Sequence, residues 1–163
     1  MISIARRRCG RRPVSTQLPA VNETTSFEAW ESTAEAELRA DPLWRMTAYR
    51  IAMYALDRGW NDAVALDRVR ITRPTASQLY RAIGSIGGNI AEGYSRASGP
   101  DRVRMFEYGL GSTRESSVWY FAARPILGAQ VVAERMAALT RIRQLLLVTI
   151  PRERARRIGR RGT

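Results

Sequence analysis

The sequence contains no histidine and no lysine, and it has one cysteine among its 163 residues. Without histidine, the chain lacks serine–histidine and cysteine–histidine nucleophile pairs, histidine-containing zinc sites and the glutamate–histidine motif of di-iron bundles. The lone Cys9 has no partner for an internal disulfide bond, which is typical of proteins from a reducing cytoplasm. We therefore expect a cytoplasmic protein that is not an enzyme and that holds no metal and no cofactor.

Long hydrophobic runs are also missing. The longest aliphatic run is Leu145 to Val148, whereas a membrane-spanning helix needs about 20 apolar residues. The apolar stretch at the start of residues 1–13 is too short for the hydrophobic region of a secretory signal peptide. An organelle transit peptide is the alternative, because this segment contains arginine and serine and no acid. We expect no membrane partner and a disordered N-terminal segment.

The charge is strongly positive and unevenly placed. The chain holds 27 basic residues, all arginine, and 15 acidic residues, for a net charge of +12. Residues 1–25 hold five arginines and one acid, residues 26–150 hold sixteen and thirteen, and residues 151–163 hold six and one. A guanidinium group binds phosphate through paired hydrogen bonds, which suits a nucleic-acid partner; coding bias in a GC-rich genome is the alternative reason for the missing lysine. Most of the excess charge therefore lies in two arginine-rich tails.

Apolar residues recur at helical spacing in four segments, and no segment shows the alternation of a β-strand. Asp41 and Pro42 predict the start of the first helix, and Gly59 to Asp62 its end. The second helix begins near Pro74 with a seam of apolar residues three and four positions apart, and Pro151 is predicted to end the fourth helix. The predicted fold is an all-α, antiparallel up-and-down four-helix bundle with flexible arginine-rich tails.

This prediction divides the chain into four parts. They are a disordered basic arm and linker over 1–26, a marginal short helix over 27–40, the bundle over 41–150 and a basic C-terminal tail over 151–163. Within the bundle, glycine is frequent in the second and third helices, for example at Gly88 and Gly111. Each helix-interior glycine costs about 1 kcal/mol relative to alanine, so we expect these two helices to approach each other closely.

The stretch from Gln78 to Gly93, QLYRAIGSIGGNIAEG, and the later Gly111-Ser112 and Glu115 resemble a signature of four-helix-bundle proteins encoded by intervening sequences in 23S rRNA genes. The resemblance covers about residues 43–150. Relatives of that family include the accessory variability determinants of diversity-generating retroelements. The resemblance implies a homo-oligomer, commonly a pentamer, that binds nucleic acid through basic surface and, in the retroelement branch, docks a reverse transcriptase. It supplies no catalytic residues.

Distinctive polar residues accompany this signature. They are Gln78, Asn89, Glu92, Ser112 and Glu115. Because buried polar groups need partners, we expect hydrogen bonds between the facing helices that fix the register of the bundle. A carboxylate metal site at Glu92 and Glu115 is the alternative, and we favour the structural role because bundle metal sites normally add histidine ligands.

Two acid-free stretches and the C-terminal tail supply the candidate nucleic-acid-binding residues. The candidates are Arg68, Arg70, Arg73, Arg81, Arg135, Arg141, Arg143, Arg152, Arg154, Arg156 and Arg157. A solvated helical face is the plain alternative, and symmetry in an oligomer would multiply the phosphate contacts. The sequence predicts a non-enzymatic nucleic-acid-binding adaptor, with RNA or DNA as ligand. A protein-interaction scaffold without direct nucleic-acid role is the second hypothesis, and a carboxylate-dependent nuclease or hydrolase is the third.

Overall fold

The computed structural model describes residues 26–159, with side chains up to residue 155, and this part of the chain is helical and contains no strand. Its elements are α1 (Phe27–Thr33), α2 (Ala36–Ala40), η1 (Pro42–Arg45), α3 (Thr47–Asp67), η2 (Arg70–Thr72), α4 (Arg73–Ser95), α5 (Gly99–Leu127) and α6 (Ala129–Gly159). The predicted all-α class is confirmed for these residues. No helix among them is long and apolar enough to span a membrane. The basic arm predicted over residues 1–26 lies almost wholly outside the described residues.

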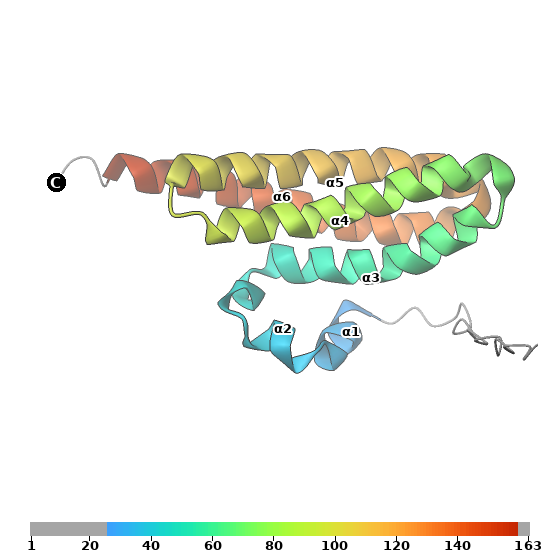
Figure 1. The fold of residues 1–163 in the computed structure, drawn as a ribbon, viewed down its shortest axis with the longest axis horizontal. Coiled ribbons are helices and arrows are strands. Elements are labelled where there is room, and N and C mark those ends of the chain that lie inside the picture. Colours follow the sequence, from blue (N-terminus) through green and yellow to red (C-terminus); the bar gives the residue numbers. More distant parts are fainter. Residues whose placement is uncertain (1–25, 160–163) are drawn as a thin grey trace, which may run out of the picture.

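The four long helices lie side by side and make up what we call the helical body, α3 to α6 (Figure 1). α4 packs against α3 and α5, and α6 packs against α5 and α3. The α3–α4 and α5–α6 turns lie at one end of the helical body, and the α4–α5 connection lies at the other (Figure 1).

A shared apolar core holds the helical body together. The predicted seam of α4 is fully buried, with Leu79, Ile83, Ile86 and Ile90 all at 0% exposure. These side chains belong to one cluster with buried residues of α3, α5 and α6. Removal of apolar surface from water contributes about 25 cal/mol per Å², so this seam is a main source of stability. The prediction of the α4 seam is confirmed.

The start and the end of the first long helix differ from the prediction. Asp41 caps η1, where its carboxylate accepts a hydrogen bond from the Leu43 N–H at 2.7 Å, and α3 begins only at Thr47. The predicted end at Gly59 is wrong, because α3 continues to Asp67. A Cβ at position 59 would lie 2.7 Å from Cδ1 of Ile83. Glycine is therefore present for close packing against α4 and does not end the helix.

The predicted end of the last helix at Pro151 is also wrong, since α6 continues to Gly159. Proline removes the hydrogen bond to the carbonyl four residues earlier, at Leu147, but both residues are exposed and water can satisfy that carbonyl. The extension is attached to α5 by the ion pair of Arg102 with Glu153, at 3.2 Å. Residues 151–159 are therefore helix where a basic tail was predicted, and residues 160–163 lie outside the described residues.

Only some of the glycines predicted to join α4 and α5 do so. A Cβ at Gly93 would clash with the Phe106 ring at 2.7 Å, and one at Gly109 would contact Ile90 and Asn89 of α4. By contrast, Gly88 and Gly111 have no neighbouring atom within 4 Å of the added Cβ. The predicted close packing of α4 on α5 is thus confirmed at Gly109, and Gly93, which is not among the predicted contacts, also packs on α5. Gly88 and Gly111 face open space.

The region predicted as one marginal helix over 27–40 forms two short helices, α1 and α2, outside the helical body (Figure 1). α1 packs on α3 through aromatic rings, with Tyr54 lying 5.8 Å from Phe27 and 5.6 Å from Trp30 between ring centroids. An ion pair of Arg50 with Glu31, at 3.0 Å, joins the same two helices. These contacts place an additional layer on the outer side of α3.

Candidate nucleic-acid interface

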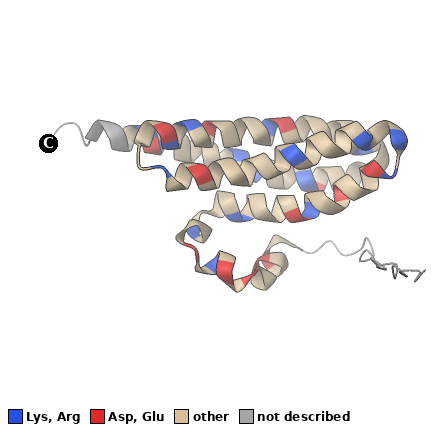
Figure 2. Ribbon diagram, in the orientation of Figure 1, with Lys and Arg blue, Asp and Glu red and all other residues tan. Residues whose placement is uncertain are grey.

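The predicted phosphate-binding arginines do not form a single cluster. Arg68 and Arg70 lie in the α3–α4 turn at one end of the helical body, and Arg152 lies near the other end, on the last turns of α6 (Figures 1 and 2). Arg141 and Arg143 lie between these ends, along α6. All five side chains are exposed, and none of them has a hydrogen-bond or ion-pair partner in the described part of the chain. They are free to meet phosphate groups.

Three further candidates are exposed but already have a partner. Arg73 donates to the backbone carbonyl of Asp67 at 3.0 Å, and Arg81 donates to the side-chain carbonyl of Gln78 at 2.6 Å. Arg154 forms an ion pair with Glu107 of α5. Exposed ion pairs contribute only about 0–1 kcal/mol, so such arginines can exchange partners at small cost. The side chains of Arg156 and Arg157 lie outside the described residues.

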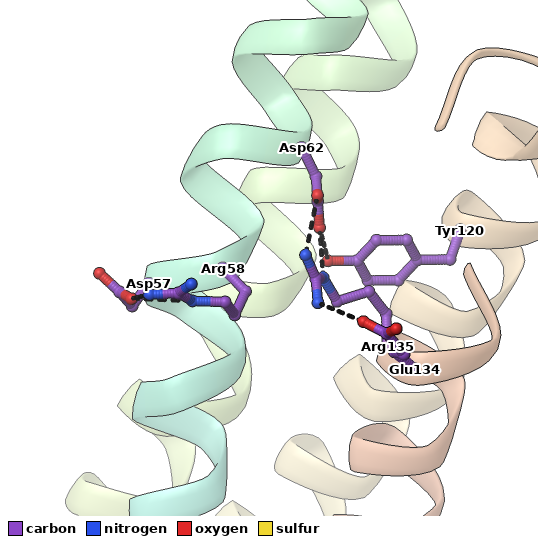
Figure 3. Close-up of polar contacts among 6 residues, drawn as sticks. All are labelled: Asp57, Arg58, Asp62, Tyr120, Glu134 and Arg135. Carbon is purple, nitrogen blue, oxygen red and sulfur yellow. Dashed lines mark hydrogen bonds and ion pairs between the residues drawn. The ribbon is translucent and has the colours of Figure 1, made fainter. Parts of the chain in front are cut away.

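Arg135 is the clear exception among the candidates. Its side chain is 13% exposed, and its Nε donates to the Oδ2 atom of Asp62 at 2.8 Å. The hydroxyl of Tyr120 donates to the same oxygen at 2.8 Å (Figure 3). Asp62 comes from α3, Tyr120 from α5 and Arg135 from α6. The prediction that Arg135 binds phosphate is wrong, because this guanidinium is part of a buried polar cluster that joins three helices.

The electrostatics of this buried cluster follow from its low exposure. Burial, followed by the charge of Asp62, raises the pKa of the Tyr120 hydroxyl far above its usual value of 10.0. Burial alone would lower the pKa of Arg135, but the hydrogen bond and the charge of Asp62 outweigh it, and the pKa is raised. Tyr120 therefore stays neutral, and Arg135 stays positively charged. The arrangement is a satisfied structural ion pair and has no free nucleophile.

The predicted polar network of α4 and α5 does not form between helices in this chain. Each member bonds within its own helix: Gln78 with Arg81, Asn89 with the Ser85 carbonyl, Glu92 with Arg96, the Ser112 carbonyl with Ser116, and Glu115 with Trp119. Helix register is instead tied by the cluster of Asp62, Tyr120 and Arg135. Among the residues that the structure describes, no group of three or more cysteine, aspartate and glutamate side chains is arranged to hold a metal ion.

Charge differs between the N-terminal and the C-terminal part of the described chain. Residues 26–67, which form α1 to α3, hold four arginines and eight acids, whereas residues 68–159 hold sixteen arginines and six acids. Figure 2 shows how these charges are distributed along the ribbon. A division of the sequence into tails and body hides this contrast, because residues 26–150 are nearly balanced as a whole.

The outer face of α5 exposes large apolar side chains. Tyr108 is 54% exposed, Val118 is 62% exposed and Phe121 is 70% exposed. Near the α5–α6 turn, Phe121 and Pro125 also line a shallow open depression. α5 contacts its neighbours α4 and α6 extensively and α3 less, so this face points away from α3 (Figure 1). An apolar face of this kind on a helix is typical of a protein–protein contact.

Residues 72–146 match the model of the 23S rRNA-intervening sequence protein family. The match covers α4, α5 and more than half of α6, which is a little under half of the chain. One similar solved structure is a protein of unknown function from the S23 ribosomal protein family of Bacteroides thetaiotaomicron, with a TM-score of 0.61 and 20% identity. The alignment covers 64% of this chain and 98% of that one, and it indicates a shared helical fold. The comparison with curated proteins finds no match.

Proposed function

We propose that the protein is a non-enzymatic nucleic-acid-binding adaptor of the 23S rRNA-intervening sequence protein family, built on an antiparallel up-and-down four-helix bundle. The observation that carries this proposal is the set of exposed arginines without partners within residues 68–159. This part of the chain holds sixteen arginines and six acids. Guanidinium groups match the geometry of phosphate oxygens, and they stay charged at every physiological pH.

The spacing of the free arginines favours a long polyanion over a small phosphorylated molecule. Arg141 and Arg152 are eleven residues apart, which is three helical turns, so they share one face of α6 about 16 Å apart. Arg68 and Arg70 lie beyond them, at the far end of the helical body. Contacts so widely separated bind sequence-independently through the backbone of RNA or DNA.

The exposed face of α5 supports assembly with further copies of this chain. Val118 and Phe121 offer apolar surface, and Gly111 leaves room for close approach. The acidic part of the chain, α1 to α3, lies on the opposite side of the helical body. A head-to-tail contact would therefore place the acidic side of one copy next to the arginines near α5 of the following copy. Such head-to-tail contacts close into a ring when the rotation between successive copies permits it, and the resemblance implies a pentamer. A ring would repeat each arginine around one axis.

The binding test uses the full chain with a fluorescent RNA hairpin and a fluorescent DNA duplex, followed by anisotropy at 50 and 200 mM salt. We expect binding at 50 mM that weakens at least ten-fold at 200 mM, because phosphate contacts release counterions. Arg141→Ala/Arg143→Ala should weaken binding. Arg39→Ala/Arg45→Ala should leave binding unchanged, because it removes two exposed arginines from the acidic part of the chain, residues 26–67. Absent binding at 50 mM, or binding that ignores salt, contradicts the proposal.

A second candidate function rests on the apolar face of α5. In this alternative the protein is an oligomeric interaction scaffold whose partner is another protein, such as the reverse transcriptase that the resemblance implies for the retroelement branch. Phe121, at 70% exposure, is the observation that favours it. A reverse-transcriptase gene and a variable repeat beside the coding sequence would support this alternative, and location inside a ribosomal RNA gene would count against it.

A further inference from the structure

Ile71, in the α3–α4 turn, is the most exposed large apolar side chain in the described part of the chain, at 85%. Its neighbour Val69 is 37% exposed. Burial of an isoleucine side chain stabilises a folded or bound state, so folding of this chain leaves a sizeable apolar group available for a ligand. Two features distinguish Ile71 from an isolated exposed residue: its turn is held by hydrogen bonds, and exposed arginines lie beside it in the sequence.

The turn that carries Ile71 is held in one conformation. The hydroxyl of Thr72 lies 2.6 Å from the carbonyl oxygen of Leu66 and 3.0 Å from that of Val69. The backbone N–H of Thr72 also donates to Val69, at 2.9 Å. Ile71 itself lies inside the 3-10 helix η2. A ligand therefore meets a preformed projection and spends little free energy on ordering it.

Exposed cations lie close to this apolar tip in the sequence. Arg68 and Arg70 are exposed on either side of Val69 and have no partner in the described residues. Arg124, near the end of α5, lies at the same end of the helical body. The nearby acid Asp67 is 3.9 Å from Arg73, which offsets its charge. The turn thus combines an exposed isoleucine with two free guanidinium groups.

We propose that this turn is a wedge for interrupted nucleic-acid duplexes, in which Arg68 and Arg70 bind phosphates and Ile71 inserts at an unstacked base step. This inference rests on the proposed function and narrows its ligand to duplexes with a bulge or unpaired base. Apolar side chains, isoleucine among them, are inserted between base steps by architectural nucleic-acid-binding proteins. Unstacking of a base costs free energy, and this cost is smallest where a base is already unpaired, so the wedge discriminates in favour of interrupted duplexes.

An anionic membrane is the other surface that takes basic and apolar groups together. Membrane binding by a helix needs an extended apolar face, whereas η2 has three residues and offers Ile71 with little besides Val69. The turn is too small for stable membrane attachment, and nucleic acid is the better match.

The test compares the full chain with Ile71→Ser on two RNA hairpin stems, one fully paired and one with a single-nucleotide bulge, and on the matching DNA pair. The wild-type chain should bind the bulged stem about ten-fold more tightly than the paired stem. Ile71→Ser should bring the two affinities within about two-fold of each other with unchanged salt dependence. Arg70→Ala should weaken binding to both stems alike. It should also reduce the slope of log affinity against log salt by about 0.9, the contribution of one phosphate contact.

Val148→Ser is the matched control, because Val148 is an aliphatic residue at 49% exposure on α6. It should retain the full preference for the bulged stem, and all variants should unfold at the wild-type temperature. Equal binding of both stems by the wild-type chain, or a preference that survives Ile71→Ser, overturns the wedge while the proposed function stands. Binding to neither stem overturns both proposals. Ile71-dependent binding to phosphatidylserine vesicles, with no Ile71 effect on nucleic acid, overturns the wedge in favour of a membrane.

Discussion

Asp62 is a buried carboxylate at 5% exposure, and its two hydrogen-bond donors explain why it is tolerated. Arg135 and Tyr120 each donate to it at 2.8 Å. Removing one partner of such a pair leaves a buried charge uncompensated, which is far more costly than the net gain from the intact pair. The residue therefore contributes more to the register of three helices than to overall stability.

We expect Asp62→Ala to lower the free energy of unfolding by about 3–5 kcal/mol, because Arg135 stays largely buried and keeps only its longer contact with Glu134, at 3.7 Å. Asp62→Leu combined with Arg135→Met should recover most of that loss. Urea unfolding at fixed protein concentration measures both. Asp57→Ala is the control, since Asp57 is exposed and pairs only with Arg58; its loss should stay within about 1 kcal/mol. A loss below 1 kcal/mol for Asp62→Ala would contradict the role assigned to the pair.

Tyr120 makes the free energy of unfolding depend on pH in the alkaline range. Its pKa is raised in the folded state by burial and by Asp62, whereas the unfolded chain loses the same proton near the usual tyrosine value of 10.0. The stabilisation is therefore complete below about pH 10 and is lost as the pH rises above it. The melting temperature should fall between pH 9 and pH 11, and Tyr120→Phe should show a smaller fall. An equal fall in both proteins would rule out this contribution.

The sequence contains a signal for Asp62 that the interpretation of Gly59 as a helix end concealed. Ala55, Gly59, Asp62 and Leu66 continue the four–three spacing of the buried face of α3, and all four are buried. An acid at a core position predicts a buried cationic partner. Which arginine serves as that partner depends on contacts between residues 73 positions apart, and local spacing does not provide this information.

At the scale of helices, some glycines lie at close packing contacts and others face open surface. Gly93→Ala should destabilise the protein by about 1–3 kcal/mol, since the added Cβ would lie 2.7 Å from Cε1 of Phe106 and 3.1 Å from Cβ of Met105. Gly88→Ala, in the same helix, meets nothing within 4 Å and should stabilise it by about 0.5–1 kcal/mol. Thermal unfolding of the two variants side by side measures the difference. Equal effects in the two variants would show that helix propensity, and not packing, decides both.

The helix prediction succeeded where apolar periodicity is strong and failed where a single residue was interpreted as a boundary. The buried seam of α4 agrees with the sequence. Gly59 and Pro151 are predicted helix ends, yet both lie inside helices. Tertiary packing at Gly59 and solvent exposure at Pro151 decide these cases, and neither is visible in local sequence.

At the scale of the whole molecule, the apolar face of α5 tests the proposed assembly. Val118→Glu should reduce the native mass toward that of the monomer, because it places a charge in the proposed contact. Val148→Glu makes the same change on an exposed residue of α6 and should leave the mass unchanged. Native mass spectrometry at several protein concentrations measures the outcome. A monomeric wild-type chain, or equal effects of both variants, would contradict assembly through α5.

The division of charge also belongs to this scale. Residues 26–67 are acidic and residues 68–159 are basic, so the free arginines belong to the basic part of the chain, although they lie at both ends of the helical body and along α6. Composition alone predicted a basic protein, but it did not predict that Arg135 is withdrawn into the core. The free candidates with described side chains reduce to Arg68, Arg70, Arg141, Arg143 and Arg152, with Arg73, Arg81 and Arg154 available after partner exchange.

The most direct test of nucleic-acid binding is the slope of log affinity against log salt for the full chain on one DNA duplex. Each phosphate contact contributes about 0.9 to that slope. The variant Arg68→Ala/Arg70→Ala/Arg141→Ala should therefore have a slope about 2.7 smaller than the wild type, while Arg39→Ala/Arg45→Ala keeps the wild-type slope. Identical slopes in all three proteins, or a wild-type affinity independent of salt, would contradict a nucleic-acid interface on these arginines.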